Sequence, residues 1–165
     1  MSRTITFERP DGTSVAGCLA EPNNAAAASA IVVIQEWWGL NPQIRGVADR
    51  LALAGYRALV PDLYRGNSTA AAEEANHLMN NLNFADAAAQ AEQDSSFPIA
   101  GVAALEETLR RANVAYTGHR YLAQHGFANE TAQGIGRLPI TQYDAAWAQV
   151  AWDRSFGFFA RHLGQ

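Results

Sequence analysis

The sequence predicts an α/β layered fold in a single domain over residues 1–165. An uncharged, β-branched run at residues 30–34 is typical of a parallel-sheet strand that is covered on both faces. A helical pattern over residues 42–54 and a second apolar run at residues 56–60 follow it. Together these three segments predict a strand–helix–strand unit, the basic repeat of an α/β sheet.

The first 20 residues predict a β-hairpin ahead of this unit. Residues 3–8 alternate polar and apolar side chains, which is the pattern of a half-buried strand. Pro10-Asp11-Gly12 predicts a turn, and residues 13–20 predict the returning strand. The lone cysteine, Cys18, lies in that strand, where neither a helix N-terminus nor a positive charge would activate its thiol. We therefore expect Cys18 to be a small core residue.

The strand–helix–strand unit carries its own boundary signals. Asn41-Pro42 predicts a helix start, with Asn as the N-cap and Pro at the first helical position. Gly55 predicts the end of that helix, and Pro61 predicts the end of the following strand.

The rest of the chain predicts four helices and one strand. The helices are expected over residues 70–81, 84–91 and 99–112 and from about Tyr143 to His162, and the strand over residues 115–121. The last helix has an apolar stripe, which consists of Trp147, Val150, Ala151, Phe158 and Leu163.

The composition is that of a globular protein with a substantial core, because 48% of the residues are hydrophobic and 17% are charged. A net charge of −4 argues against a nucleic acid or an anionic membrane as the partner. The absence of lysine excludes lysine Schiff-base chemistry and a P-loop lysine. A single cysteine and the lack of a signal-peptide or membrane-spanning pattern lead us to expect a cytoplasmic location.

Several segments, in order, resemble the dienelactone hydrolase family of the α/β-hydrolase superfamily. Residues 33–41 (VIQEWWGLN) resemble its first active-site loop, and residues 60–64 (VPDLY) continue the likeness. Residues 93–98 (QDSSFP) resemble the acid loop, and residues 121–130, with His125-Gly126-Phe127, resemble the histidine loop. The resemblance implies a truncated α/β-hydrolase-like three-layer fold, with a mostly parallel sheet and an N-terminal β-hairpin.

The nucleophile segment departs from the family pattern. The family places a cysteine in a G-x-C-x-G motif, on a sharp strand-to-helix turn between the early loops and the acid loop. This sequence contains neither G-x-C-x-G nor G-x-S-x-G. By resemblance, a block of roughly seventy residues that holds this turn and the central strands next to residues 31–34 is absent.

The resemblance implies a role for two residues of the later loops. His125 would be the base that takes a proton from the nucleophile, and Asp94 would be the acid that fixes the tautomer of His125. The alternative is an aspartate in a helix-capping loop and a histidine on the surface.

The resemblance also implies roles for the loop that follows residues 30–34. Glu36 would lie beside the nucleophile, and the backbone N–H of Trp37 would contribute to the oxyanion hole. The alternative is a solvated loop carboxylate, with Trp37 and Trp38 packed in a core or an interface. The expected substrate pocket consists of Trp38, Tyr64, Phe127 and Asn129. Asn129 stands where some relatives carry arginine.

Two functions remain open on these grounds. The first is a carboxylic ester or lactone hydrolase, whose activity is low or lost because the nucleophile is missing. The second is a non-catalytic relic that acts as a binding or structural module. The three histidines His77, His119 and His162 show no ligand spacing, so we expect no metal, and we expect no cofactor.

The expected partners follow from the same arguments. A small-molecule ester or lactone is the partner if the chain is active, and neither nucleic acid nor membrane is expected. Loss of central strands would expose an edge at residues 31–34, and an exposed edge pairs readily with another chain. We therefore expect a homo-oligomer, and a swapped dimer is one form that it could take. The rival outcome is a rearranged monomer in which residues 115–121 pair beside residues 31–34.

Overall fold

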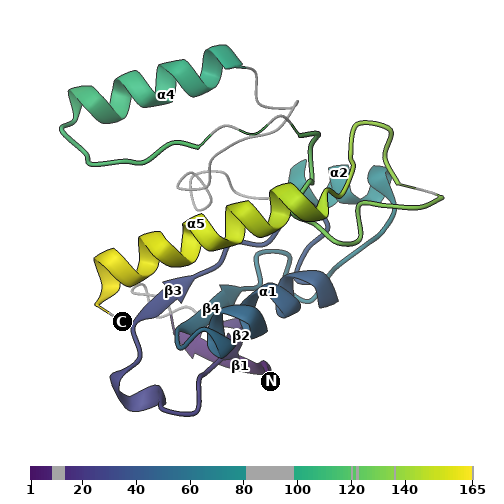
Figure 1. Ribbon diagram of the computed structural model, residues 1–165. Helices are drawn as coiled ribbons and strands as arrows, with labels where there is room; N and C mark the ends of the chain where they lie inside the picture. The colour runs from purple at the N-terminus through teal and green to yellow at the C-terminus, as the bar shows by residue number, and fades with distance from the viewer. Residues whose placement is uncertain (9–13, 81–98, 120, 122, 136, 165) are drawn as a thin grey trace. The chain divides into compact units, whose positions relative to one another are not determined.

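The computed structural model describes residues 1–8, 14–80, 99–119, 121, 123–135 and 137–164 (Figure 1). The chain divides into two compact units. Unit 1 comprises Met1–Ala89 and Phe156–Gln165, and unit 2 comprises Gln90–Ser155. Three expected features lie outside the described residues: the turn at Pro10-Asp11-Gly12, the helix over residues 84–91 and the acid loop that holds Asp94.

Unit 1 is built on a four-stranded sheet with the order β1-β2-β4-β3. Strands β1 (Arg3–Glu8) and β2 (Ser14–Ala20) pair antiparallel and form the expected hairpin. Strand β4 (Arg57–Pro61) pairs antiparallel with β2, and β3 (Ala30–Val32) pairs parallel with β4. The α/β class and the hairpin are therefore confirmed.

The prediction of a mostly parallel sheet is wrong, since two of the three pairings are antiparallel. The described part of the chain contains one strand–helix–strand unit, which supplies one parallel pairing. The hairpin supplies the antiparallel pairings, because a tight turn reverses the direction of the chain.

Helix α1 (Pro42–Leu53) connects the parallel strands β3 and β4, as expected. The Asn41 side chain accepts a hydrogen bond from the backbone N–H of Ile44 at 3.0 Å and caps the helix. Gly55, with φ of 98°, turns the chain after the helix, which an L-residue with a Cβ would resist. The buried side chains of α1 pack against β2 and β4, and they are Ile44, Ala48, Leu51 and Ala52.

The core of unit 1 lies between α1 and the sheet. Cys18, Ala20, Ala58 and Val60 are completely buried, and Cys18 faces Val60 in the strand register. The expectation that Cys18 is a core residue is confirmed. Deleting a side chain here, such as that of Leu51, is expected to cost about 2–5 kcal/mol of stability, because the transfer energy is lost and a cavity remains.

Strand β3 differs from its prediction. Val32 is 59% exposed and Ile34 is 39% exposed, so the expectation of a strand covered on both faces is wrong. The reason is its position, because β3 is the last strand of the sheet and has a neighbour on one side among the described strands. Burial of a parallel strand depends on neighbours that the local sequence does not encode.

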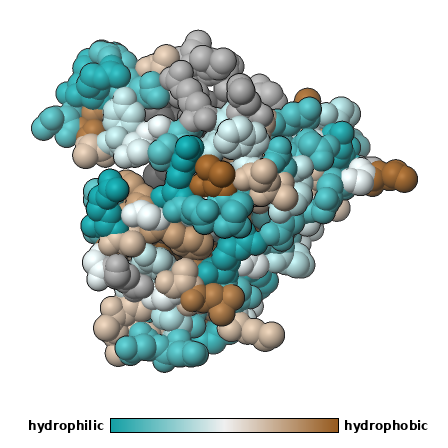
Figure 2. Space-filling model, in the orientation of Figure 1, coloured by the Kyte–Doolittle hydropathy of each residue, from teal (hydrophilic) through white to brown (hydrophobic). Residues whose placement is uncertain are grey.

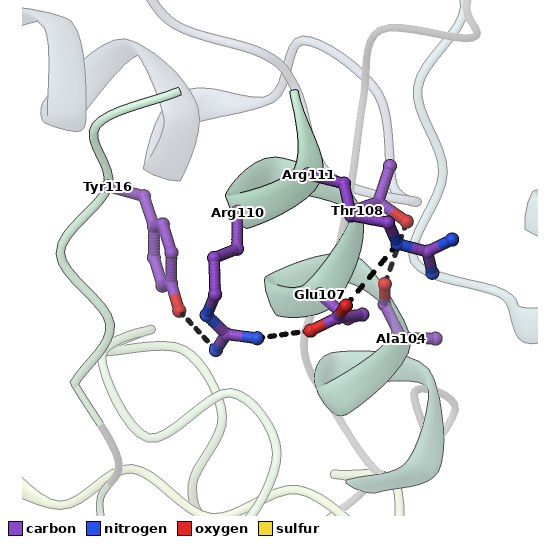
Figure 3. A network of polar contacts seen from close by, with 6 residues as sticks. All are labelled: Ala104, Glu107, Thr108, Arg110, Arg111 and Tyr116. Carbon is purple, nitrogen blue, oxygen red and sulfur yellow. Dashed lines mark hydrogen bonds and ion pairs between the residues drawn. The ribbon is translucent and has the colours of Figure 1, made fainter. Parts of the chain in front are cut away.

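Helix α2 (Ala72–Asn80) confirms the helix expected over residues 70–81, and α4 (Ile99–Arg111), in unit 2, confirms the one over residues 99–112. At the end of α4, Glu107 binds both Arg110 and Arg111, and Arg110 also donates to the hydroxyl of Tyr116 at 3.3 Å (Figure 3). Tyr116 and Glu107 together raise the pKa of Arg110.

The prediction of a strand at residues 115–121 is wrong. The described residues of this segment are irregular, and the side chains of residues 115–119 are exposed. A strand needs a partner and a buried face, and Tyr116 instead turns its hydroxyl to Arg110.

Helix α5 (Ala145–Leu163) confirms the last expected helix. Within unit 1, its end lies beside the start of β3 (Figure 1), where the Ser29 hydroxyl donates to the carbonyl of Leu163 at 2.9 Å. Phe159 packs edge-on against Tyr56, whereas Phe158 is 43% exposed, so the expected apolar stripe is wrong at Phe158. None of the described helices is both long and apolar enough to cross a membrane.

Candidate active site

The Gln35 side chain connects the loop that follows β3 to the loop that follows β4. It comes after β3, is 8% exposed, and its Oε1 accepts the backbone N–H of Leu63 at 3.1 Å. The Nε2 of Gln35 and the Nε1 of Trp37 are buried and have no hydrogen-bond partner among the described residues. Sequence reasoning gave Gln35 no role of its own. A polar side chain directly after an apolar run was the signal that pointed to it.

A glycine turn fixes the loop that carries Glu36. The N–H of Gly39 donates to the carbonyl of Glu36 at 3.0 Å, and Gly39 has a φ of 87°. A Cβ at this position would lie 2.7 Å from the carbonyl oxygen of Asn67 and 3.1 Å from the ring of Tyr64. Glycine is required here because the neighbouring loop approaches so closely.

The second loop, which follows β4, is organised by Asp62. Its carboxylate accepts the N–H of Tyr64 at 3.2 Å and the N–H of Gly66 at 2.7 Å. Arg65 and Gly66 both have positive φ, which lets the chain double back toward Gly39. Tyr64 is 7% exposed, and this burial raises the pKa of its hydroxyl.

Unit 1 therefore brings four of the expected site residues onto adjoining loops. Glu36 is exposed, the rings of Trp37 and Trp38 lie 4.7 Å apart, and Tyr64 packs under the Gly39 turn. Both loops follow the carboxyl ends of parallel strands, where α/β sheets place ligands. A carboxylate beside aromatic rings can hold or orient a polar group of an otherwise apolar substrate.

The histidine loop belongs to unit 2 and is held by backbone hydrogen bonds. The carbonyl of His125 accepts the N–H of Gln142 at 3.0 Å, and that of Phe127 accepts the N–H of Asp144 at 2.9 Å. Gly126 has a φ of 69°, and a Cβ there would meet that of Ala132 at 3.3 Å. The loop is thus fixed to the segment that leads into α5.

Asn129 organises the turn after His125. It is 7% exposed, and its side-chain oxygen accepts hydrogen bonds from the N–H of Thr131 at 2.9 Å and from the hydroxyl of Thr131 at 2.7 Å. This oxygen therefore holds the turn, and substrate contact by Asn129 stays a prediction. Phe127 packs against Tyr121, with ring centres 5.1 Å apart.

Asp144 is a structural residue that sequence reasoning missed. Its carboxylate accepts the N–H of Trp147 at 3.0 Å and caps α5. Together with the backbone bond from its N–H to Phe127, this cap joins the histidine loop to the first turn of the helix. An aspartate just ahead of a long apolar helical pattern was the available signal.

The site residues thus fall into separate groups. Glu36, Trp37, Trp38 and Tyr64 belong to unit 1, whereas His125, Phe127 and Asn129 belong to unit 2. Asp94 lies outside the described residues. No cluster of three His, Cys, Asp or Glu side chains suited to a metal ion occurs in the described part of the chain.

A hollow of about 880 Å³ in unit 1 lies elsewhere. Its lining includes Ala28 and Gly55, which precede β3 and β4, so it lies at the opposite ends of these strands from Glu36. Its carboxylates are already engaged, since Glu21 pairs with Arg3 and Arg57. This hollow is therefore not the expected substrate pocket.

A hairpin followed by parallel strands whose carboxyl ends carry the candidate loops defines an α/β protein with the ligand-site geometry of such sheets. The model of the dienelactone hydrolase family matches residues 15–88 and 85–163, and the chain belongs to this family.

Curated relatives match parts of the chain. A protein of Saccharolobus solfataricus named "Putative carboxymethylenebutenolidase" is 42% identical over 67 residues, which cover 41% of this chain and 25% of that protein. A protein of Escherichia coli strain K12 named "Putative hydrolase fragment YghX" is 47% identical over 60 residues, which cover 35% of this chain and 51% of that protein. The matched segments thus span between a quarter and about half of the length of these two relatives.

A solved structure described as "m3DLH" supports the fold. It superposes with a TM-score of 0.76 at 19% identity, and the likeness covers 97% of this chain and 98% of that chain.

Proposed function

We propose that the chain is a carboxylic ester or lactone hydrolase, as its resemblance to the family implies, and that its activity is low or lost. The observation that carries this proposal is the Glu36 loop, which follows the carboxyl end of β3 and is locked to the Tyr64 loop in a segment that matches the family. The Saccharolobus relative supports the substrate class, because its name denotes a lactone hydrolase.

In this proposal each residue has the role that the family pattern implies. His125 moves the proton, Asp94 orients His125, and the N–H of Trp37 stabilises the oxyanion. Trp38, Tyr64, Phe127 and Asn129 bound the substrate.

The missing nucleophile sets the expected level of activity. The sequence has no G-x-C-x-G and no G-x-S-x-G motif, and Cys18 is buried in the sheet. Without that nucleophile, a water molecule attacks the ester carbonyl, His125 takes the proton of this water and returns it to the leaving alcohol, and only part of the rate acceleration of a complete triad remains. We therefore expect slow hydrolysis of activated esters and little hydrolysis of stable ones.

Hydrolysis of p-nitrophenyl acetate tests the proposal. A general base typically contributes roughly 10²–10⁴-fold, so His125→Ala should abolish most of the rate above background. His119→Ala is the matched control, because His119 is an exposed histidine of unit 2 that also offers an imidazole to the ester. Equal rates in wild type, His125→Ala and His119→Ala would overturn the enzymatic proposal.

The second candidate function is a non-catalytic binding or structural module. The exposed strand β3, together with the absent nucleophile motif, favours it. A folded protein with no ester hydrolysis that depends on His125 would support this function. For either function, a cytoplasmic location is a prediction that rests on the single cysteine.

A further inference from the structure

Among the described strands, β3 has a neighbour on one side, and its other hydrogen-bonding edge is not paired with any of them. Its ladder with β4 uses alternate residues, since the carbonyl of Ser29 accepts the N–H of Arg57 at 2.9 Å and the N–H of Val33 donates to the carbonyl of Leu59 at 2.8 Å. In a parallel ladder the residues between these contacts direct their N–H and C=O groups to the opposite side. The backbone groups of Ala30, Val32 and Ile34 therefore point away from β4, and no described strand pairs with them.

The same edge lacks two of the features that protect an exposed strand, namely charged side chains and a proline. Natural edges carry charged side chains, especially lysine, or a proline within the strand. Here residues 22–35 include no charged side chain, and the whole chain has no lysine. Val32 and Ile34 leave apolar surface exposed beside the unpaired backbone groups. On the face drawn in Figure 2, apolar residues, in brown, lie among polar residues, in teal.

The edge is self-complementary. If two copies of β3 run antiparallel with Val32 opposite Val32, Ala30 lies opposite Ile34, so a small side chain meets a large one. The outward-facing backbone groups of all three residues then meet as hydrogen-bonded pairs. Glu36 falls opposite Ala28, so no like charges oppose each other.

We propose that β3 pairs antiparallel with β3 of a second copy of this chain, about a two-fold axis, and joins the two four-stranded sheets into one. A two-fold axis uses the same surface on both copies, so one exposed strand is sufficient. The dimer is weak, because strand pairing over residues 30–34 alone buries less area than the roughly 1,000 Å² of a stable interface. It requires no catalytic residue and is independent of the proposed hydrolase activity.

Sedimentation equilibrium over a range of protein concentrations tests the dimer. The wild-type chain, of 17.8 kDa, should shift toward twice that mass as its concentration rises. Val32→Lys should remain at about 17.8 kDa throughout, because two ammonium groups would face each other across the axis. Leu53→Lys is the matched control, because it removes an apolar side chain that is 91% exposed in α1, outside the edge. It should dimerise as the wild type does.

Three outcomes would overturn the proposal. They are a wild-type chain that stays at 17.8 kDa at every concentration, a Val32→Lys variant that dimerises like the wild type, and a Leu53→Lys variant that loses the dimer as fully as Val32→Lys does. Circular dichroism establishes that each variant is folded. If Val32→Lys fails to fold, Val32→Thr, which keeps the β-branched shape but weakens the apolar contact, should raise the dimer dissociation constant several-fold. An unchanged constant would also overturn the proposal.

Discussion

The loop after β3 and the histidine loop are both turns around a glycine with positive φ, but they are held in different ways. The first is fixed by contacts across the sequence, such as the hydrogen bond from Leu63 to Gln35 and the close approach of Asn67 to Gly39. The second is fixed by backbone bonds to the residues that lead into α5.

This difference teaches that each loop is ordered by its own unit. The Glu36 loop depends on the β3–β4 ladder and on the loop after β4, whereas the histidine loop depends on the start of α5. The hydrogen bonds that hold each loop thus join residues of the same unit.

The largest expected effect comes from crowding the Gly39 turn. Gly39→Ala should destabilise the protein by about 1–2 kcal/mol for the left-handed backbone, plus about 1–3 kcal/mol for the clash with Asn67. Gly66→Ala should show the backbone cost alone, because Gly66 also has positive φ but nothing lies within 4 Å of its added Cβ. Urea unfolding measures both, and equal losses would contradict the close approach of the two loops.

A smaller effect is expected from the two helix caps. Asn41→Ala removes the cap of α1 and Asp144→Ala removes that of α5, and each should cost about 1 kcal/mol. Amide hydrogen exchange should show faster exchange in the first turn of α1 for the first variant, and in the histidine loop for the second. Faster amide exchange in the histidine loop of Asn41→Ala would contradict the claim that each loop is held by contacts within its own unit.

The smallest effect is the response of the Tyr64 loop to alkaline pH. Burial raises the pKa of Tyr64 above its value in the unfolded chain. The stability that comes from the neutral hydroxyl is therefore complete below the unfolded value of about 10, and it is lost as the pH rises through the raised pKa. Tyrosine absorbance should show one late-ionising group that disappears in Tyr64→Phe. A titration that is unchanged in Tyr64→Phe would contradict this burial.

Local signals explain how much of the fold the sequence predicts. Asn41-Pro42, Gly55 and Pro61 act on their own neighbours, so the bounds of α1 and β4 match the expectation closely. Residues 115–121 have strand-like side chains, but a strand also needs a partner, which propensity does not supply.

Local motifs indicated candidate site residues, whereas contacts between residues that lie far apart in the sequence could not be predicted. Glu36 follows β3 in the chain, as the order of the segments indicates, and its role in a site stays a prediction. Gln35 was missed as an anchor because its partner, Leu63, lies 28 residues away. Asn129 was expected in a substrate pocket, and no motif in the sequence indicates that its side-chain oxygen accepts hydrogen bonds from Thr131.

Cross-linking tests most directly whether the two loops serve one site, as the proposed hydrolase function requires. In a Glu36→Cys/His125→Cys variant, a short bis-maleimide should join the two thiols within one chain, seen as a cross-linked species of monomer mass. Cys18 is fully buried and should not compete, and Leu53→Cys/His125→Cys is the control that should stay unlinked. Single adducts alone in the first variant, or equal cross-linking in both variants, would contradict a shared site.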